Sequence, residues 1–230
     1  MRARVGAGGQ AHPGAVIRAV FFDLDGTLVR YRGAPFESSW GALGAAAGVG
    51  VQWDELLARY RGRVEEYADW VRKNAALLQG LPFSRVEAAL FPPPYAPGSR
   101  AAIAELKRAG HLLGIVSSGV NIVADRVREE LGLAFAVANE LQIADGRFAG
   151  EAMVRVGLAD KRAAVEREAR RWGLALEEVA FVGDHLNDVP VFGAVGYAIA
   201  YAPKEPEVAA AAHAVVHHFR PIPELVRAAS

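Results

Sequence analysis

The chain has 230 residues, enough for one α/β core or for a core with a small second lobe. Its 26 lysines and arginines balance 26 acidic residues, which excludes a charge field built for nucleic acid or an anionic membrane and favours a small-molecule partner. The absence of cysteine excludes disulfides and thiolate catalysis and is compatible with a reducing cytoplasm. No apolar run approaches the length that crosses a bilayer. Residues 1–15 are basic and glycine-rich without the apolar stretch of a signal peptide, so we expect a flexible tail.

The sequence VFFDLDGTLV, residues 20–29, begins as a buried strand and ends in two carboxylates. Its apolar start is typical of a strand covered on both faces of a parallel sheet. Asp23 and Asp25 lie two residues apart, so both should point to the same side at the carboxyl end of the strand, where open α/β sheets bind ligands. Two carboxylates this close repel each other unless a cation or a proton lies between them. The pair therefore predicts a bound metal or one protonated acid.

The same pattern also begins a calcium-binding loop, which needs an oxygen ligand at its fifth position and a glutamate at its twelfth. Thr27 and Ala34 occupy those positions, so the calcium interpretation fails at the more demanding one. A strand that simply turns at surface acids is a second alternative, since Asp and Gly are ordinary turn residues.

Residues 32–95 are predicted to form a compact, all-helical insertion after the first strand. Apolar residues at helical spacing indicate one helix within 33–48, a long amphipathic helix across 53–71 and a short helix around 86–90. The prolines of FPPPYAPG, residues 91–98, forbid regular structure and mark a linker. The core is therefore expected to comprise residues 16–31 and 96–230.

The second half of the chain alternates helices and strands, the pattern of parallel βαβ units. Helices are expected at 101–109, 120–131 and 160–172, and strands at 111–116, 179–183 and 195–201, before a short edge strand and a terminal helix. Alternating apolar residues around Asp145 and Gly146 predict an antiparallel hairpin. The fold class is thus α/β, a doubly wound parallel sheet with helices on both faces.

Polar residues follow three of the predicted strands: DLDGT after residue 22, SSG after 116 and GDHLND after 182. The carboxyl ends of strands lie side by side in a doubly wound sheet, so these segments should converge on one crevice. A phosphate monoester suits such a site, because a carboxylate can attack its dianion only where cations and N–H donors neutralise the repulsion.

In that chemistry Asp23 is the expected nucleophile, and Asp184 is its partner in holding a divalent ion. Oxygen-only ligands favour Mg²⁺. Asp25 is expected to protonate the leaving alcohol and then to activate the water that opens an aspartyl-phosphate. With the metal present, Asp23 should stay ionised while Asp25 can carry a proton.

The phosphate oxygens are expected to bind the Ser117 hydroxyl and the backbone N–H groups of Ser118 and Gly119. Lys161, at the start of the next helix, supplies positive charge. Taken singly, Ser117 could merely cap a helix and Lys161 could be a solvated surface lysine. Their positions in the ordered set favour the functional interpretation.

In this order DLDGT, the serine of IVSSG, a lone helix-initiating lysine and GDHLND resemble the four motifs of the haloacid-dehalogenase-like superfamily of phosphohydrolases, over the chain from residue 16 onward. The resemblance implies a Rossmann-like core, a covalent aspartyl-phosphate intermediate and a type-one cap, here residues 32–95. It implies Mg²⁺ ligation by the side chains of Asp23 and Asp184 and by the backbone carbonyl of Asp25. The supporting residues that it implies are Gly183, Asn187 and Asp188.

Within the superfamily the sequence is most similar to phosphoserine phosphatases, through ANEL at 138–141, the later DG and glycine, the lysine and GDxxND. Those enzymes usually grip serine with a cap glutamate and, further along, an arginine. The chain departs from both features: the corresponding segments read Arg30, Tyr31, Arg32, with Glu37 as the first acid, and Arg72, Lys73, Asn74. The cations predict a substrate with an additional acidic group, bound by Arg32 and Arg72.

We therefore expect a Mg²⁺-dependent phosphomonoesterase acting on a small phosphorylated metabolite, with phosphoserine as a candidate, in a cytoplasmic monomer or homodimer. A phosphomutase and a non-catalytic scaffold are the alternatives. A dehalogenase is disfavoured, because Asp25 and Asp184 would have no task in attack on an alkyl halide. His185 is expected to be an idle, exposed loop residue. His213, His217 and His218 are expected on a surface edge strand and not in a metal site.

Overall fold

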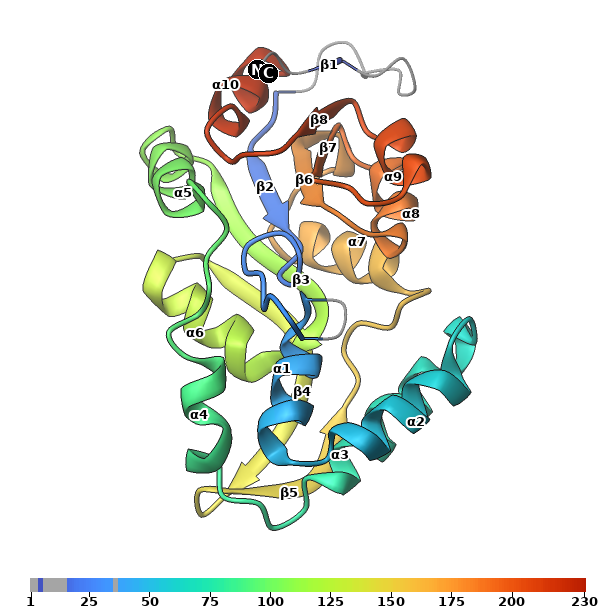
Figure 1. Ribbon diagram of the computed structural model, residues 1–230. Coiled ribbons are helices and arrows are strands. Elements are labelled where there is room, and N and C mark those ends of the chain that lie inside the picture. The colour runs from blue at the N-terminus through green and yellow to red at the C-terminus, as the bar shows by residue number, and fades with distance from the viewer. Residues whose placement is uncertain (1–3, 6–15, 35–36) are drawn as a thin grey trace.

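The computed structural model describes residues 4–5, 16–34 and 37–230, and its central element is an eight-stranded sheet (Figure 1). The strand order is β1-β8-β7-β6-β2-β3-β4-β5, and all pairings are parallel except β1 with β8 and β4 with β5. The strands are β1 (Arg4–Val5), β2 (Ala19–Phe22), β3 (Leu112–Val120), β4 (Phe135–Ala144), β5 (Arg147–Met153), β6 (Val179–Gly183), β7 (Tyr197–Tyr201) and β8 (Ala214–Val216). The predicted α/β class with a mostly parallel sheet is confirmed.

Helices cover both faces of this sheet because the central strand β2 sends alternate side chains into two buried clusters. Phe22 packs in the cluster that contains Val127, on the face covered by α5 (Ser99–Arg108), α6 (Asn121–Leu131) and α10 (Ile222–Ala228). Phe21 packs in the cluster that contains Val165, on the face covered by α7 (Lys161–Arg171), α8 (Val189–Phe192) and α9 (Pro206–Ala211). A strand buried on both faces reads as a continuous apolar run, as this one does.

Four helices lie between β2 and α5 in the chain: α1 (Ser39–Ala47), α2 (Gly50–Tyr60), α3 (Tyr67–Leu77) and α4 (Ser84–Leu90), which we call the helical insertion. The single helix expected across 53–71 is wrong. The chain leaves the helix at Arg61, and Gly62 takes the left-handed φ of +77° that glycine adopts most readily. A 3₁₀ turn, η2 (Val64–Glu66), then leads into α3. The helix expected within 33–48 begins only at Ser39, and its Phe36 lies outside the described residues.

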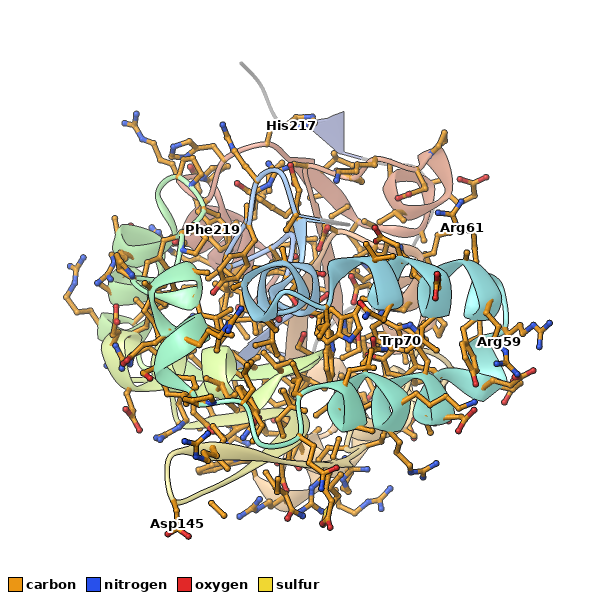
Figure 2. All side chains as sticks on the ribbon, turned by 60° about the horizontal axis from the view of Figure 1, so that its bottom comes forward. Arg59, Arg61, Trp70, Asp145, His217 and Phe219 are labelled. Atoms are coloured by element: carbon orange, nitrogen blue, oxygen red, sulfur yellow. The ribbon has the colours of Figure 1, made fainter. Side chains whose placement is uncertain are left out.

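The break after α2 lets α3 fold back and bury an aromatic cluster. The ring centroid of Trp40 lies 5.8 Å from that of Trp53 and 5.5 Å from that of Trp70, in edge-on geometry. Figure 2 shows Trp70 inside the insertion, whereas Arg59 and Arg61 lie at its outer end. These three tryptophans therefore pack against one another within the insertion.

The predicted hairpin is β4–β5, with both turn residues, Asp145 and Gly146, at positive φ. Its second strand also pairs with the insertion: Gly80 N–H donates to the Phe148 carbonyl at 2.8 Å, and Phe148 N–H donates to the Leu81 carbonyl at 3.0 Å. The hairpin therefore joins the insertion to the core at the end of the molecule where Asp145 lies (Figure 2).

Three details differ from the expectations. The strand expected to end at residue 116 continues to Val120, with an irregular register against β4 after Val116. Residues 4–5 of the expected tail form β1 outside β8, so β8 is not the edge; the rest of residues 1–15 lies outside the described residues. His213 is buried, where its Nδ1 accepts from Ala198 N–H at 2.9 Å.

Within the described part of the chain, no helix is both long and apolar enough to span a membrane.

Candidate active site

The sheet topology brings the three polar segments together. β2 lies between β3 and β6, and Phe22 is in register with Ile115 on one side and Val182 on the other. The residues that follow these strands therefore share one edge, the carboxyl end of the parallel sheet. The convergence predicted for DLDGT, SSG and GDHLND is what the structure shows.

At this edge the Lys161 ammonium lies between two carboxylates. Its Nζ is 2.7 Å from Asp23 Oδ2, and it donates a short hydrogen bond to Asp188 Oδ1. All three residues are buried, and Lys161 is only 1% exposed. Burial lowers the pKa of Lys161, but the carboxylates of Asp188 and Asp23 outweigh burial and raise it above its ordinary value. Lys161 is therefore a fixed buried cation, as predicted, and not a solvated surface lysine.

Asp184 completes an acidic cluster with Asp23 and Asp188, in which each carboxylate offers an oxygen within 4.8 Å of the others. Both oxygens of Asp188 already have donors: Lys161 at one, and the backbone N–H groups of Asp184 and His185 at the other, at 2.9 and 3.0 Å. Asp188 is thereby tied to Lys161 and to the backbone of the last motif. Asp23 is held in a similar way, because its Oδ1 accepts from Leu24 N–H at 2.7 Å and its Oδ2 faces Lys161.

Asp184 is held against the first motif. Thr27 Oγ1 donates to its Oδ1 at 2.7 Å, and a Cβ placed on Gly26 would lie 2.1 Å from its Oδ2. Burial, followed by the nearby carboxylates of Asp23 and Asp188, raises the pKa of Asp184 well above its ordinary value. A cluster of hard oxygen donors in which negative charge is costly fits a small divalent cation such as Mg²⁺.

Asp25 is not one of the three clustered carboxylates and contacts Ser39 instead. Both of its oxygens accept from Ser39, Oδ1 from the backbone N–H at 2.8 Å and Oδ2 from the hydroxyl at 2.7 Å. Burial raises the pKa of Asp25 to about 7, although the Ser39 hydrogen bonds oppose the shift. A carboxyl group that titrates near neutrality can serve both as an acid and as a base, the pair of roles predicted for this residue.

The SSG segment lies beside the two aspartates of the first motif. Ser117 is buried and its Oγ accepts from Gly119 N–H at 3.1 Å. A Cβ on Gly119 would lie 2.5 Å from Asp25 Oδ2, so only glycine lets the loop approach the acid this closely. The Ser118 side chain is 3.4 Å from Asn187 Nδ2, which links the loop to the last motif.

Three side chains that the sequence analysis did not single out fix this loop through the Ser118 carbonyl. It accepts from Trp40 Nε1 at 3.0 Å, from the Tyr67 hydroxyl at 2.6 Å and from Asn139 Nδ2 at 2.9 Å. Trp40 and Tyr67 belong to the helical insertion, and Asn139 to β4. Asn139 lies within the ANEL sequence that carries the family resemblance, whereas no sequence signal indicates that two aromatic residues would donate hydrogen bonds here.

The cations that the sequence predicts for substrate binding lie at the surface. Arg32 and Arg72 are both exposed. Two residues after Arg72 on α3, Asn74 is buried and its Nδ2 donates to Trp70 O at 2.8 Å. Arg30 instead forms an ion pair with Glu37 at 2.9 Å. His185 is exposed, as predicted, and its Nδ1 lies 3.2 Å from Asn187 Oδ1.

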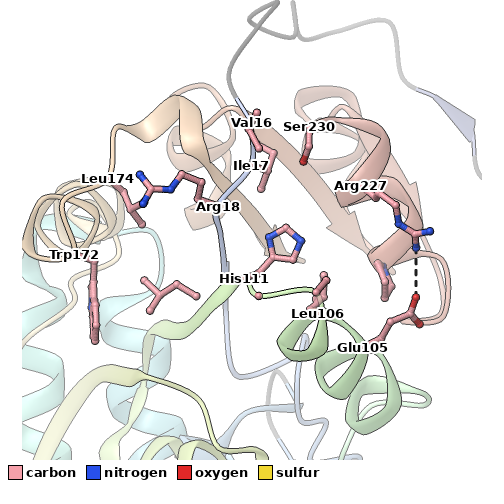
Figure 3. Close-up of a pocket in the computed structure, with 14 residues that line it drawn as sticks. Val16, Ile17, Arg18, Glu105, Leu106, His111, Trp172, Leu174, Arg227 and Ser230 are labelled. Atoms are coloured by element: carbon pink, nitrogen blue, oxygen red, sulfur yellow. Dashed lines mark hydrogen bonds and ion pairs between the residues drawn. The ribbon is translucent and has the colours of Figure 1, made fainter.

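A cavity of about 550 Å³ lies elsewhere, at the amino ends of β2 and β3 (Figure 3). Ile17, Leu106, Trp172 and Leu174 contribute apolar walls. Arg18 also lines the cavity, and its side chain is 60% exposed. The Arg18 Nη1 atom forms an ion pair with Glu178 Oε1 at 3.1 Å. None of the three clustered carboxylates lines this cavity. The candidate active site is therefore at the opposite, carboxyl end of the parallel strands.

The chain is similar to several proteins named phosphoserine phosphatase. A phosphoserine phosphatase of Archaeoglobus fulgidus is 34% identical over 190 residues, 82% of this chain and 53% of that protein. One of Methanocaldococcus jannaschii is 29% identical over 81% of this chain and 86% of the relative. The chain spans about half the length of the Archaeoglobus relative and of a Streptomyces coelicolor phosphoserine phosphatase, 33% identical. A solved phospho-aspartyl intermediate analogue of phosphoserine phosphatase superposes with a TM-score of 0.74 at 27% identity, covering 91% of this chain and 99% of that one.

The fold and the site define a doubly wound α/β protein with a carboxylate cluster, a buried lysine and a serine loop at the carboxyl ends of its parallel strands. The sequence profile of the haloacid dehalogenase-like hydrolases matches residues 20–193. The chain belongs to the haloacid dehalogenase-like hydrolase family.

Proposed function

We propose that the protein is a Mg²⁺-dependent phosphomonoesterase that hydrolyses a small phosphorylated metabolite through an aspartyl-phosphate on Asp23, in the cytoplasm. The observation that carries the proposal is the placement of the buried Lys161 ammonium 2.7 Å from Asp23, at a sheet edge shared with the serine loop. Relatives named phosphoserine phosphatase make phosphoserine the first candidate substrate. A monomer or homodimer remains our expectation.

The chain's own residues supply the steps of the reaction. Asp23 attacks the phosphorus, while Lys161, the Ser117 hydroxyl and the N–H groups of Ser118 and Gly119 bind the phosphoryl oxygens. Asp25 gives its proton to the leaving alcohol, and the resulting carboxylate then removes a proton from the water that hydrolyses the acyl phosphate.

Asp23, Asp184 and the backbone carbonyl of Asp25 would hold Mg²⁺, with Gly183, Asn187 and Asp188 in support. When bound, the ion would offset the negative charge that the carboxylates and the phosphate bring together. The fit rests on the crowded oxygen donors and on Gly26, whose missing side chain leaves Asp184 its place.

The helical insertion acts as a cap, with residues 32–95 as its extent. Trp40 and Tyr67 reach from it to the Ser118 carbonyl, so the insertion lies over the phosphate loop and the leaving group must meet it. Closure of such an element also excludes water from the reaction. Arg32, in the segment that enters the cap, is the candidate partner of an acidic group on the substrate. Arg72 would need a rearrangement of α3, because it is exposed there.

Phosphate release from a panel of phosphorylated metabolites and p-nitrophenyl phosphate tests the proposal. We expect turnover that requires Mg²⁺, that EDTA abolishes and that Asp23→Asn reduces by at least about 10⁴-fold, as for loss of a covalent nucleophile. Asp54→Asn, an exposed acid of the insertion, is the control and should match the wild type. Transfer of phosphate to a second sugar hydroxyl without free phosphate would indicate a phosphomutase. No turnover under any condition would indicate a scaffold.

A further inference from the structure

Ser39 contacts Asp25 with both of its donors. It is the first residue of α1, is fully buried, and places its N–H and its hydroxyl at the two oxygens of one carboxylate, at 2.8 and 2.7 Å. This arrangement fixes the rotamer of Asp25, since a carboxylate held at both oxygens cannot rotate without breaking a hydrogen bond.

The hydroxyl of Ser39 has a defined direction. Its oxygen accepts a long hydrogen bond from Val120 N–H at 3.4 Å, so its single proton is left for Asp25. The acceptor carboxylate is also confined from the other side, where a Cβ on Gly119 would lie 2.5 Å from Asp25 Oδ2 and 3.1 Å from Ser39 Oγ. A relay therefore runs from the end of β3 through Ser39 to Asp25.

Capping of α1 does not explain these contacts. The N-cap of the helix is Ser38, whose Oγ accepts from Gly41 N–H at 3.1 Å. The hydroxyl of Ser39 is directed to the site instead, although the two serines are adjacent in sequence and alike in chemistry.

We propose that Ser39 is a positioning residue for the reaction: it aims the Asp25 carboxyl at the leaving oxygen of the substrate. This inference rests on the proposed phosphomonoesterase function and adds to it a residue of the helical insertion that acts through Asp25. The contacts of Ser39 are with the Asp25 carboxylate and the Val120 N–H, so it acts through Asp25.

The contribution of a correctly placed Asp25 should depend on the leaving group of the substrate. An alkyl phosphate needs a proton on its departing oxygen, whereas the phenolate of p-nitrophenyl phosphate is stable enough to leave without one. The value of kcat/KM reports the steps up to the first irreversible one, here formation of the aspartyl-phosphate. Misplacement of Asp25 should therefore reduce kcat/KM for the alkyl ester and spare the aryl ester.

The experiment measures kcat/KM of the wild type, Ser39→Ala and Ser38→Ala with p-nitrophenyl phosphate and with the alkyl phosphate that the wild type hydrolyses fastest. For Ser39→Ala we expect the alkyl-to-aryl ratio of kcat/KM to fall about 10- to 100-fold, part of the usual effect of a general acid. Ser38→Ala, which removes the helix cap, should keep the wild-type ratio. The ratio is independent of the active fraction of each preparation, so partial unfolding cannot imitate the result.

An unchanged ratio in Ser39→Ala, beside a wild type that hydrolyses both esters, would overturn the positioning role and leave the phosphatase proposal intact. The same loss of ratio in Ser38→Ala would also overturn it, because the effect would then come from the helix start. A wild type that hydrolyses neither ester overturns both proposals.

Discussion

The Lys161 ammonium lies 2.7 Å from Asp23 Oδ2, although the two residues are separated by most of the core sequence. It also contacts Asp188, so one buried cation serves the first and the last motif at once. Paired buried charges contribute little net stability, but removal of one partner leaves the other charge uncompensated. The site therefore depends on this lysine for its own integrity as well as for phosphate binding.

Lys161→Met should destabilise the metal-free protein by about 3–5 kcal/mol, since Asp23 and Asp188 would then lie buried without their cation. Mg²⁺ should restore part of this loss, because it places positive charge among the same carboxylates. Urea unfolding in EDTA and in Mg²⁺ measures both effects. Lys204→Met is the control, as that side chain is 57% exposed, and it should change stability by less than about 0.5 kcal/mol. Equal stability of Lys161→Met and the wild type in EDTA would contradict the expectation.

Tyr67→Phe should weaken binding of inorganic phosphate, because it removes the 2.6 Å hydrogen bond that the insertion donates to the Ser118 carbonyl. A net hydrogen bond is worth about 1 kcal/mol, so the inhibition constant of phosphate should rise about fivefold. Tyr60→Phe provides the matched control, since that hydroxyl contacts Asp69 and Lys73 and no residue of the site. If both variants bind phosphate as tightly as the wild type, the hydrogen bond from Tyr67 to the Ser118 carbonyl does not hold the serine loop in place.

Gly26→Ala should reduce Mg²⁺ affinity by about 10- to 100-fold, the usual effect of displacing a group that orients a ligand. The new Cβ would lie 2.1 Å from Asp184 Oδ2, at a backbone φ of +80°. Gly33→Ala separates the steric clash of the added Cβ from the strain of a positive φ. Gly33 has a φ of +86°, but no atom lies within 4 Å of its added Cβ. Calorimetric titration with Mg²⁺ should therefore show the loss in the first variant only. A similar loss in both would attribute the effect to the backbone.

Asp25 should make the stability of the metal-free protein fall as pH rises. Its pKa is about 7 in the folded protein against an ordinary value of 3.8, so between those pH values the folded state holds a proton that the unfolded state has released. At about 1.4 kcal/mol for each pKa unit, the contribution lost between pH 4 and pH 7 is at most roughly 4 kcal/mol. Unfolding of the wild type and of Asp25→Asn in EDTA across this range measures it. The free energy of unfolding of Asp25→Asn should rise relative to that of the wild type as pH rises. Parallel curves of unfolding free energy against pH would contradict the raised pKa of Asp25.

The sequence by itself determined most elements of the core and the order of the polar motifs along the chain. The apolar run of β2, the alternation of helices and strands after residue 96 and the hairpin at Asp145 are local patterns of side-chain periodicity and turn chemistry, and these need no knowledge of distant contacts. Asp23 and Asp184 could be selected because parallel strands present their carboxyl ends at one edge, a rule of topology that holds before any coordinate is known. Lys161 was selected from its place at the start of a helix within the ordered set of motifs.

Only the tertiary structure decided which side chains of the insertion face that edge. The helix expected across 53–71 is interrupted at Gly62, and the fold-back turns Tyr67 toward the Ser118 carbonyl and leaves Arg72 exposed. Ser38 and Ser39 are equivalent in sequence, yet one caps α1 and the other holds Asp25. Such choices depend on the direction in which a whole helix packs, and a helical pattern fixes only the face that is apolar, not the partner that the face meets.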